Sequence, residues 1–289
     1  MKNIICILFF LLVSFANGQT ILSQKFDTIT MTFKGSKTEQ AMYLLRYVKK
    51  YAELGENLKE LPPFLNQILS GKKKVVSVKT LKKYLKKLKI DYLNTGGNID
   101  LPVSKSENKI LANYFVIHDA SNFVKNDSTD TFPSNVNDAD YRSNKLEFYK
   151  AFEHSHVFVN RLGESMTCND FNKAIRATKF ENKKYNPTLG GKAIGNFIHI
   201  ELIQPRMADK GKKNDAIAIL PGFTDAQYQK LALLYFTASV RKGDWLVPIF
   251  HAVLDQNFDD GHDDPQHFEL EKFVFELEKC FNDLKNQRK

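Results

Sequence analysis

Two different hydrophobic patterns divide this chain. In residues 19–108, apolar side chains recur every three to four positions, and this spacing predicts amphipathic helices, for example over residues 38–51 and 80–88. After a turn-rich connector, short apolar runs alternate with helical segments. The predicted strands are residues 114–117, 156–160, 197–203 and 245–250, and the predicted helices are residues 224–241 and 269–286. Strands interleaved with helices indicate an α/β domain around one sheet, preceded by a small helical unit.

The first residues have the composition of an export signal. One lysine precedes an apolar run over residues 4–13, and the small residues Ala16 and Gly18 precede Gln19. Because that run is too short to span a bilayer comfortably, we expect a signal peptide over residues 1–18 and an exported protein, periplasmic or secreted. No later segment is apolar enough to suggest a membrane-spanning protein. The chain is therefore divided into a signal peptide (1–18), a lysine-rich helical region (19–108) and an α/β domain (109–289).

The formal net charge of +9 suits nucleic acid, an anionic envelope surface or an acidic polymer, and by itself distinguishes none of them. Nucleic acid is not expected as a partner, since charge alone supports it and the protein is exported. For the lysines of residues 19–108 we favour solvation of the outer faces of packed helices, with a contact to an anionic polymer or the cell wall as the alternative. Only Cys168 and Cys280 follow the signal peptide, and whether they pair is left open, as is the oligomeric state.

Three potential metal ligands lie far apart along the chain. His118 and His251 each close an apolar run, and Asp264 lies in an acidic loop. Two imidazoles and one carboxylate, without an obvious fourth ligand, are typical of an open hydrolytic zinc site. The residues close enough along the chain to replace Asp264 are His262, Asp263 and His267.

Strand alternation adds polar residues to this list. In residues 195–202, His199 and Glu201 share a face opposite three aliphatic side chains, and in residues 152–160, His154 and His156 share another. Polar groups on apolar strands cost free energy unless they find partners, so convergence on one cleft is expected. Two alternatives stay open: His154 and His156 as a separate metal pair, and Glu201 as a hydrogen-bond partner of His199 or of a lysine.

Other chemistries find no support in the residues. A calcium loop of the EF-hand type starting at Asp255 would need glycine at position 260 and glutamate at position 266, where the chain has aspartate and glutamine. Cys168 lacks a protease context, and the Gly-x-Ser-x-Gly elbow of serine hydrolases is missing. Metal-assisted hydrolysis remains the best-supported chemistry.

Five segments carry a resemblance to a known family. They are residues 113–118, residues 156–163, residues 195–202, the start of the helix at Phe223, and His251 followed by Asp264-Pro265. In this order they resemble the zinc-dependent N-acetylmuramoyl-L-alanine amidases, a family that includes phage amidase lysozymes and animal peptidoglycan recognition proteins. The resemblance covers roughly residues 110–280 and leaves residues 19–108 unexplained. It implies a central mixed β-sheet flanked by helices.

The resemblance also implies roles for single residues. His118, His251 and Asp264 would hold Zn²⁺, and Glu201, which matches the glutamate of the family's Ile-Glu-Leu segment, would assist proton transfer. His262 occupies a position where the family often has a lysine that stabilises the oxyanion, so Glu201 and His262 are the catalytic candidates. The candidates for substrate binding are His156, Lys179 and His199.

The resulting hypothesis is an exported zinc hydrolase that cleaves the amide bond between N-acetylmuramic acid and L-alanine in peptidoglycan, with peptidoglycan or muropeptides as partners. The alternatives are a non-catalytic peptidoglycan-binding module of the same fold, and a structural envelope protein that depends on its basic helices. Under the first hypothesis, the domain from about residue 108 onward is expected to retain some turnover alone. The biological role, which spans wall remodelling, recycling, cell separation and antagonism, stays open, as does the preference for a stem peptide.

Overall fold

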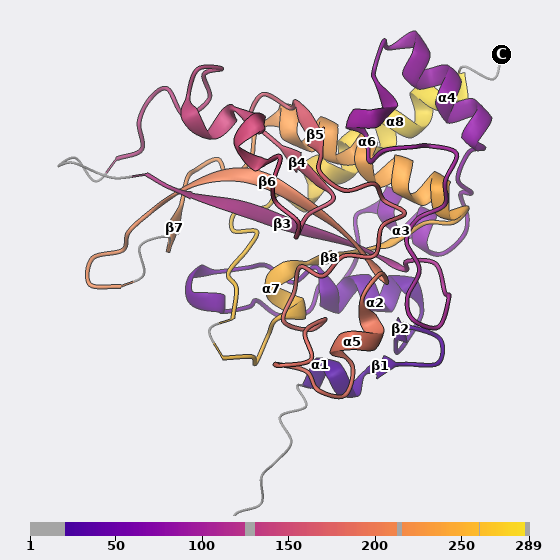
Figure 1. The fold of residues 1–289 in the computed structure, drawn as a ribbon, viewed down its shortest axis with the longest axis horizontal. Coiled ribbons are helices and arrows are strands. Elements are labelled where there is room, and N and C mark those ends of the chain that lie inside the picture. The colour runs from indigo at the N-terminus through magenta and orange to yellow at the C-terminus, as the bar shows by residue number, and fades with distance from the viewer. Residues whose placement is uncertain (1–20, 125–130, 213–215, 260, 287–289) are drawn as a thin grey trace, which may run out of the picture.

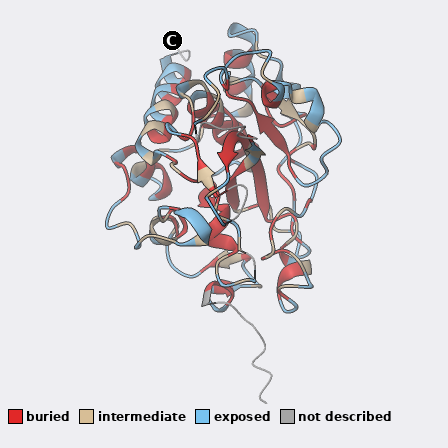
Figure 2. Ribbon diagram, turned by 90° about the vertical axis from the view of Figure 1, so that its left-hand side faces the viewer, coloured by how far each residue is buried: buried red, intermediate tan, exposed pale blue. Residues whose placement is uncertain are grey.

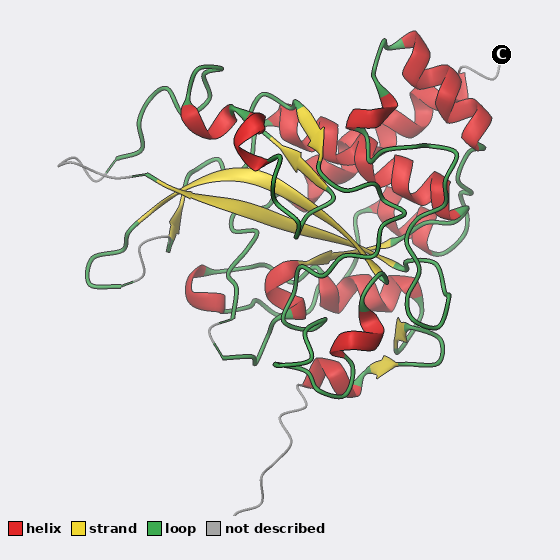
Figure 3. Cartoon of the chain, in the orientation of Figure 1, coloured by secondary structure: helices red, strands yellow, loops and turns green. Residues whose placement is uncertain are grey.

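The computed structural model describes residues 21–124, 131–212, 216–259 and 261–286, and the predicted signal peptide lies outside these ranges. Within them, a six-stranded mixed sheet lies between two layers of helices (Figures 1 and 3). This confirms the predicted α/β class with a central mixed sheet flanked by helices. No helix in these ranges is long and apolar enough to cross a membrane.

The sheet is built around its two longest strands, β3 (Tyr114–Phe123) and β6 (Phe197–Met207), which are parallel neighbours. The other strands are β4 (Val157–Val159), β5 (Ser165–Thr167), β7 (Ile217–Ala218) and β8 (Val247–Phe250). The strand order is β5-β4-β6-β3-β8; β4 and β8 run parallel to their central neighbours, while β5 and β7 pair antiparallel. All four predicted strands are therefore present.

Strand β3 is apolar on both faces because helices cover both faces. On one face the Tyr114 hydroxyl donates to Gln40 in the helix α2 (Lys37–Leu44). On the other, the Phe115 ring packs edge-to-face against Tyr235 of α6 (Asp225–Lys242). Such double coverage is usual for parallel sheets, and Figure 2 shows the central strands as buried along most of their length.

The two long helices after β6 follow their sequence signals. Helix α6 begins after Thr224, whose side chain accepts from the Gln227 backbone while Gln227 reaches back, as a capping box requires, and it ends at Gly243 in the left-handed conformation. Helix α8 (Leu270–Asn286) packs on α6. The short helices α5 (Gly190–Ala193) and α7 (His251–Leu254) lie with α2 on the opposite side of the sheet (Figure 1).

Residues 21–108 are less purely helical than their pattern predicts. The elements are α1 (Ile21–Gln24), β1 (Phe26–Asp27), β2 (Thr32–Phe33), α2, α3 (Pro63–Leu69) and α4 (Val78–Lys87); the short 3₁₀ turns along the chain are Lys50–Ala52, Tyr92–Asn94, Arg142–Asn144 and Leu146–Tyr149. The helix predicted over residues 38–51 ends at Leu44. Val48 is nevertheless buried. Its backbone forms an isolated bridge with Leu54 and does not continue the helix.

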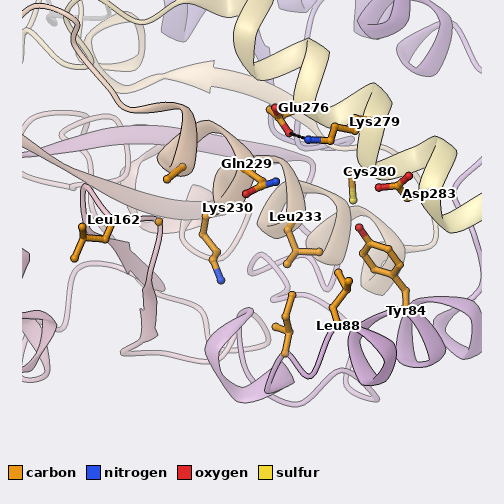
Figure 4. Close-up of a pocket in the computed structure, with 13 residues that line it drawn as sticks. Tyr84, Leu88, Leu162, Gln229, Lys230, Leu233, Glu276, Lys279, Cys280 and Asp283 are labelled. Atoms are coloured by element: carbon orange, nitrogen blue, oxygen red, sulfur yellow. Dashed lines mark hydrogen bonds and ion pairs between the residues drawn. The ribbon is translucent and has the colours of Figure 1, made fainter. Parts of the chain in front are cut away.

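This region shares one hydrophobic core with the rest of the chain. The Phe33 ring packs against Tyr114, and Phe64 of α3 packs against Phe281 of α8. Figure 4 shows Tyr84 of α4 directed at the Cys280 thiol of α8. Cys168 and Cys280 are both free thiols. Since β3 packs directly on residues 33–44, the expectation that the domain from residue 108 onward works alone does not fit this packing.

Candidate metal centre

The three predicted ligands come together on the α2 side of the sheet. His118 is the fifth residue of β3, and His251 opens α7 directly after β8, the strand beside β3. His118 Nδ1 lies 2.9 Å from His251 Nδ1. Asp264 Oδ2 lies 3.0 Å from His251 Nδ1 and 3.8 Å from His118 Nδ1.

These separations suit a small tetrahedral cation. Three atoms at such distances have a common centre about 1.9 Å from each, close to the roughly 2.0–2.2 Å bonds of zinc to imidazole nitrogen and carboxylate oxygen. A metal ion placed slightly out of the plane of the three atoms would reach the full bond lengths. The three donors could therefore hold a small cation such as zinc, and among the described residues this group has three members, which would leave the fourth position of a tetrahedron to a non-protein ligand.

Asp264 is held in place from the sheet. Its Oδ2 accepts from the Asp119 backbone N–H at 3.1 Å, and its carbonyl oxygen accepts from the Ala252 N–H at 2.9 Å. Arg206, fully buried on β6, forms an ion pair with Asp119 and also donates to the Asp263 carbonyl oxygen at 3.3 Å. Two strands thus fix the loop that carries the third ligand.

Each imidazole is supported on its far side by a buried carboxylate. His251 Nε2 lies 3.0 Å from Asp255 Oδ2, while Asp255 Oδ1 accepts from the backbone N–H groups of Lys179 and Phe180. Such carboxylate–histidine pairs orient metal ligands and fix their tautomer. Asp255 follows the last residue of α7 and lies four positions after His251, so the two side chains lie on the same side of that helical turn.

His118 reaches its carboxylate through a second histidine. His118 Nε2 lies 2.9 Å from His199 Nδ1, and His199 Nε2 lies 3.2 Å from Glu181 Oε2. Glu181 is fully buried and accepts from the Thr178 hydroxyl. Its contact with His199 joins a loop to a distant strand, which no local pattern encodes.

His199 and His156 do not lie where a substrate could touch them. Both side chains are fully buried, and His156 Nδ1 accepts from the His199 backbone N–H at 3.0 Å. The prediction that they bind substrate does not fit this burial: His199 contacts His118 from behind, and His156 in turn contacts the His199 backbone. His154 is exposed beside the Arg176 carbonyl oxygen, and among the described residues it belongs to no group of three potential metal ligands.

Buried charge sets the protonation of the donors. Burial lowers the pKa of His251, but Asp264 and Asp255 outweigh it and raise that pKa well above its ordinary value. Burial and the neighbouring His251 lower the pKa of His118 well below its ordinary value. Burial raises the pKa of Asp264, yet His251 reverses this, so the net direction is downward. One proton, on His251, thus stands where a cation would bind.

Glu201 lies beside His118 at the edge of the three donors. It pairs in register with His118 across β3 and β6, and its Oε1 lies 3.8 Å from His118 Nδ1. Its side chain keeps 17% of its surface exposed, whereas that of His118 keeps 2%. Burial, with Asp264 next in size, raises the pKa of Glu201 to about 8. A carboxyl group that changes protonation near neutral pH is suited to acid–base chemistry.

His262 and Lys179 lie at the outer rim of the centre, where both contact Asp255. The His262 ring stacks on His251 with centroids 4.1 Å apart, and its Nδ1 lies 2.7 Å from Asp255 Oδ2. Its side chain is 45% exposed, so it can meet a bound molecule. The Lys179 ammonium group donates to the Asp259 carbonyl oxygen, in the loop that also carries His262. Of the alternatives to Asp264, His267 contacts the Tyr47 hydroxyl instead, and Asp263 pairs with Arg206.

A second group of potential ligands shares His251. His251 Nε2, Asp255 and His262 also lie close enough together to hold a metal ion. A neutral imidazole has one lone pair, so His251 can serve only one group at a time. We favour the group with His118, because all three of its members are buried, whereas His262 in the second group is exposed.

A hollow of about 810 Å³ opens at the carboxyl end of β3. Asn122 of β3 donates to the Tyr149 hydroxyl at 2.6 Å, and Phe148 and Phe152 are exposed on its wall. Burial is the main cause that raises the pKa of Tyr149 to about 12. The charge of Glu201 acts in the same direction, and the hydrogen bond from Asn122 acts against it. Parallel sheets commonly bind ligands at this edge. The sequence reasoning missed these residues, although the aromatic spacing of residues 141–152 was a usable signal.

A scan against protein-family models gives no match to this chain, and a search of curated proteins gives none.

Proposed function

We propose that this protein is an exported zinc-dependent amidase that hydrolyses the bond between N-acetylmuramic acid and L-alanine in peptidoglycan. The observation that carries the proposal is the convergence of His118, His251 and Asp264 on one centre, with Glu201 beside His118. The order of these residues along the chain supports the amidase class over other zinc hydrolases, through the resemblance described above.

The residues divide the work between binding and proton transfer. His118, His251 and Asp264 would hold the cation, oriented by His199 and Asp255. If bound, zinc would supply Lewis-acid chemistry by polarising the amide carbonyl and lowering the pKa of a water to about 7, and its charge would lower the pKa of Glu201. Glu201 then accepts a proton from the attacking water and delivers it to the departing nitrogen, which an amide requires because its leaving group is poor.

The substrate would extend from Glu201 into the hollow at the end of β3. Exposed aromatic rings such as Phe148 and Phe152 offer flat apolar surfaces for a sugar or peptide, and Tyr149 and Asn122 supply polar groups. His262 stands at the rim, where its N–H could donate to the oxyanion.

Zinc content and cell-wall digestion test this proposal together. The purified protein is expected to bind one equivalent of zinc and to release free stem peptides from purified peptidoglycan. His118→Ala should lose both properties. The matched control is His154→Ala, which removes an exposed histidine outside the centre and should behave like the wild type.

The possible failures separate the alternatives. Zinc binding without release of stem peptide would point to another amide substrate or to a module that binds peptidoglycan without cutting it. Binding of less than one equivalent of zinc in the folded wild-type protein would refute the metal centre itself.

A further inference from the structure

The outer face of α4 carries a concentration of positive charge that the proposed amidase does not use. Lys79, Lys82, Lys83 and Lys86 recur at helical spacing along it, and Lys89 follows its end; all five side chains are exposed. We call these five residues the α4 lysine cluster. The opposite face of the helix, with Leu81, Tyr84 and Leu85, is buried against the rest of the protein.

The cluster is poorly neutralised by its surroundings. Within the described ranges, one of its members forms an ion pair, Lys82 with Asp100 at 2.5 Å. Lysines four residues apart repel each other on a helix, and Lys79 lies in the first turn, where the helix dipole disfavours a cation. The helix therefore carries these charges at some cost to its own stability.

Two adjoining hollows lie among these lysines. One, of about 560 Å³, has an apolar floor of Leu85, Ile90 and Ile99, and its rim carries Lys82, Lys86, Lys89 and Tyr92 together with Asp91 and Asp100. The other is lined by Val78, Asp100 and four members of the cluster. An apolar floor under a mainly cationic rim suits an amphiphile with an anionic headgroup better than a fully hydrated polyanion.

Exposed apolar side chains extend this surface. Tyr92 and Leu93, in the turn after α4, keep 45% and 53% of their surface exposed. Tyrosine and leucine beside lysines are typical of protein surfaces that settle into the interfacial region of a bilayer. A soluble anionic polymer would have nothing to pair with these two side chains.

We infer that α4 and the turn at residues 92–94 dock on an anionic lipid surface, with lipid phosphates at the α4 lysine cluster and with Tyr92 and Leu93 in the interfacial layer. Helix α4 packs on α6 and α8, whereas the candidate metal centre lies on the α2 and α7 side of the sheet (Figure 1). A docked molecule thus keeps that centre turned away from the lipid.

Vesicle co-sedimentation of the mature full-length protein tests this inference. Vesicles of phosphatidylcholine and phosphatidylglycerol in equal parts should bind the protein, pure phosphatidylcholine should not, and binding should weaken as salt screens the charges. The variant Lys79→Gln/Lys83→Gln/Lys86→Gln should bind on the order of 100-fold more weakly, because each lysine near such a surface contributes roughly a factor of five. The matched control Lys59→Gln/Lys105→Gln/Lys109→Gln removes the same charge from exposed positions elsewhere and should bind nearly as well as the wild type.

A second pair of measurements separates lipid from free polyanion. Tyr92→Ser/Leu93→Ser should weaken binding to the anionic vesicles about tenfold or more and leave binding to soluble polyphosphate unchanged, since only the bilayer accepts apolar groups. Equal loss in the two lysine triple variants would overturn the α4 site. Binding to polyphosphate as tight as to vesicles, with no effect of the Tyr92 and Leu93 changes, would overturn the lipid assignment in favour of a soluble polymer.

Discussion

The substitution Asp255→Asn tests the outer support of the metal centre without changing its size. Asp255 is fully buried and accepts from both sides: Oδ1 from the backbone N–H groups of Lys179 and Phe180, and Oδ2 from His251 Nε2 at 3.0 Å. To bind a cation through Nδ1, His251 must carry its proton on Nε2, and Asp255 is the acceptor that stabilises this tautomer.

An asparagine cannot satisfy both sides. If its oxygen stays with the two backbone N–H groups, its NH₂ faces His251 Nε2 and drives the proton to Nδ1, the ligand atom. If the amide turns over, its NH₂ faces two N–H groups and all three are left without acceptors. A buried polar group without a partner costs about 1–3 kcal/mol. We therefore expect zinc affinity to fall by about 10–100-fold, in line with other changes of this kind.

The assay is competition for zinc against a chromophoric chelator, carried out on protein shown by circular dichroism to be folded. Asp259→Asn is the matched control, because Asp259 is an exposed residue in the same loop and the charge change is equal. It should leave the dissociation constant for zinc within about twofold of the wild-type value, a range below ~0.5 kcal/mol. If Asp255→Asn also stayed within that range while folded, the assignment of Asp255 to His251 would be refuted.

Five further outcomes are expected. The pKa of His251 is raised in the metal-free fold, so its proton stabilises that fold below about pH 6.5 and this contribution is lost as the pH rises through the raised pKa. Zinc must displace this proton and, by lowering the pKa of Glu201, favours loss of a second one, so its affinity should rise by about tenfold or more per pH unit near neutrality, with between one and two protons released in calorimetry across buffers. Glu201→Gln should keep zinc and lose about 100-fold or more in the rate of stem-peptide release. Arg206→Met leaves Asp119 as a buried unpaired charge, so urea unfolding should show a loss of about 3–5 kcal/mol. Deletion of residues 19–108 should abolish the cooperative unfolding transition seen by circular dichroism, because it uncovers one face of β3.

The sequence predicts most of the inner part of the centre because strands impose simple rules. His118 and His251 stand out as polar residues that close apolar runs, and alternation along β6 puts Glu201 on the same face as His199. The structure adds the register, in which Glu201 lies beside His118. That neighbourhood depends on the order of strands in the sheet, which no local pattern encodes.

The outer part of the centre escapes such reasoning for physical reasons. Asp255 follows His251 on a helix of four residues, too short to show a periodic pattern. Glu181 lies in a loop and meets His199 only through tertiary packing. The same limit explains the N-terminal region, where the apolar spacing after Leu44 reflects a bridge and long-range burial instead of a longer helix.

The charges around the centre would favour the binding of a cation there. Asp119, Asp255 and Asp264 are buried around the centre, and Glu201 lies beside them. Among the described residues, the permanently charged cation in contact with this group is Arg206, which forms ion pairs with Asp119 and Asp263. Without a metal ion, the excess negative charge is relieved by protons: one on His251, one on Glu201, whose pKa is raised to about 8, and at mildly acidic pH one on Asp119, whose pKa burial raises to about 6. In the proposed zinc form, the cation would replace these protons at the point where His118 and His251 supply neutral nitrogen ligands. Binding and folding would then be coupled, and zinc at 100 times its dissociation constant would stabilise the folded chain by about 2.7 kcal/mol.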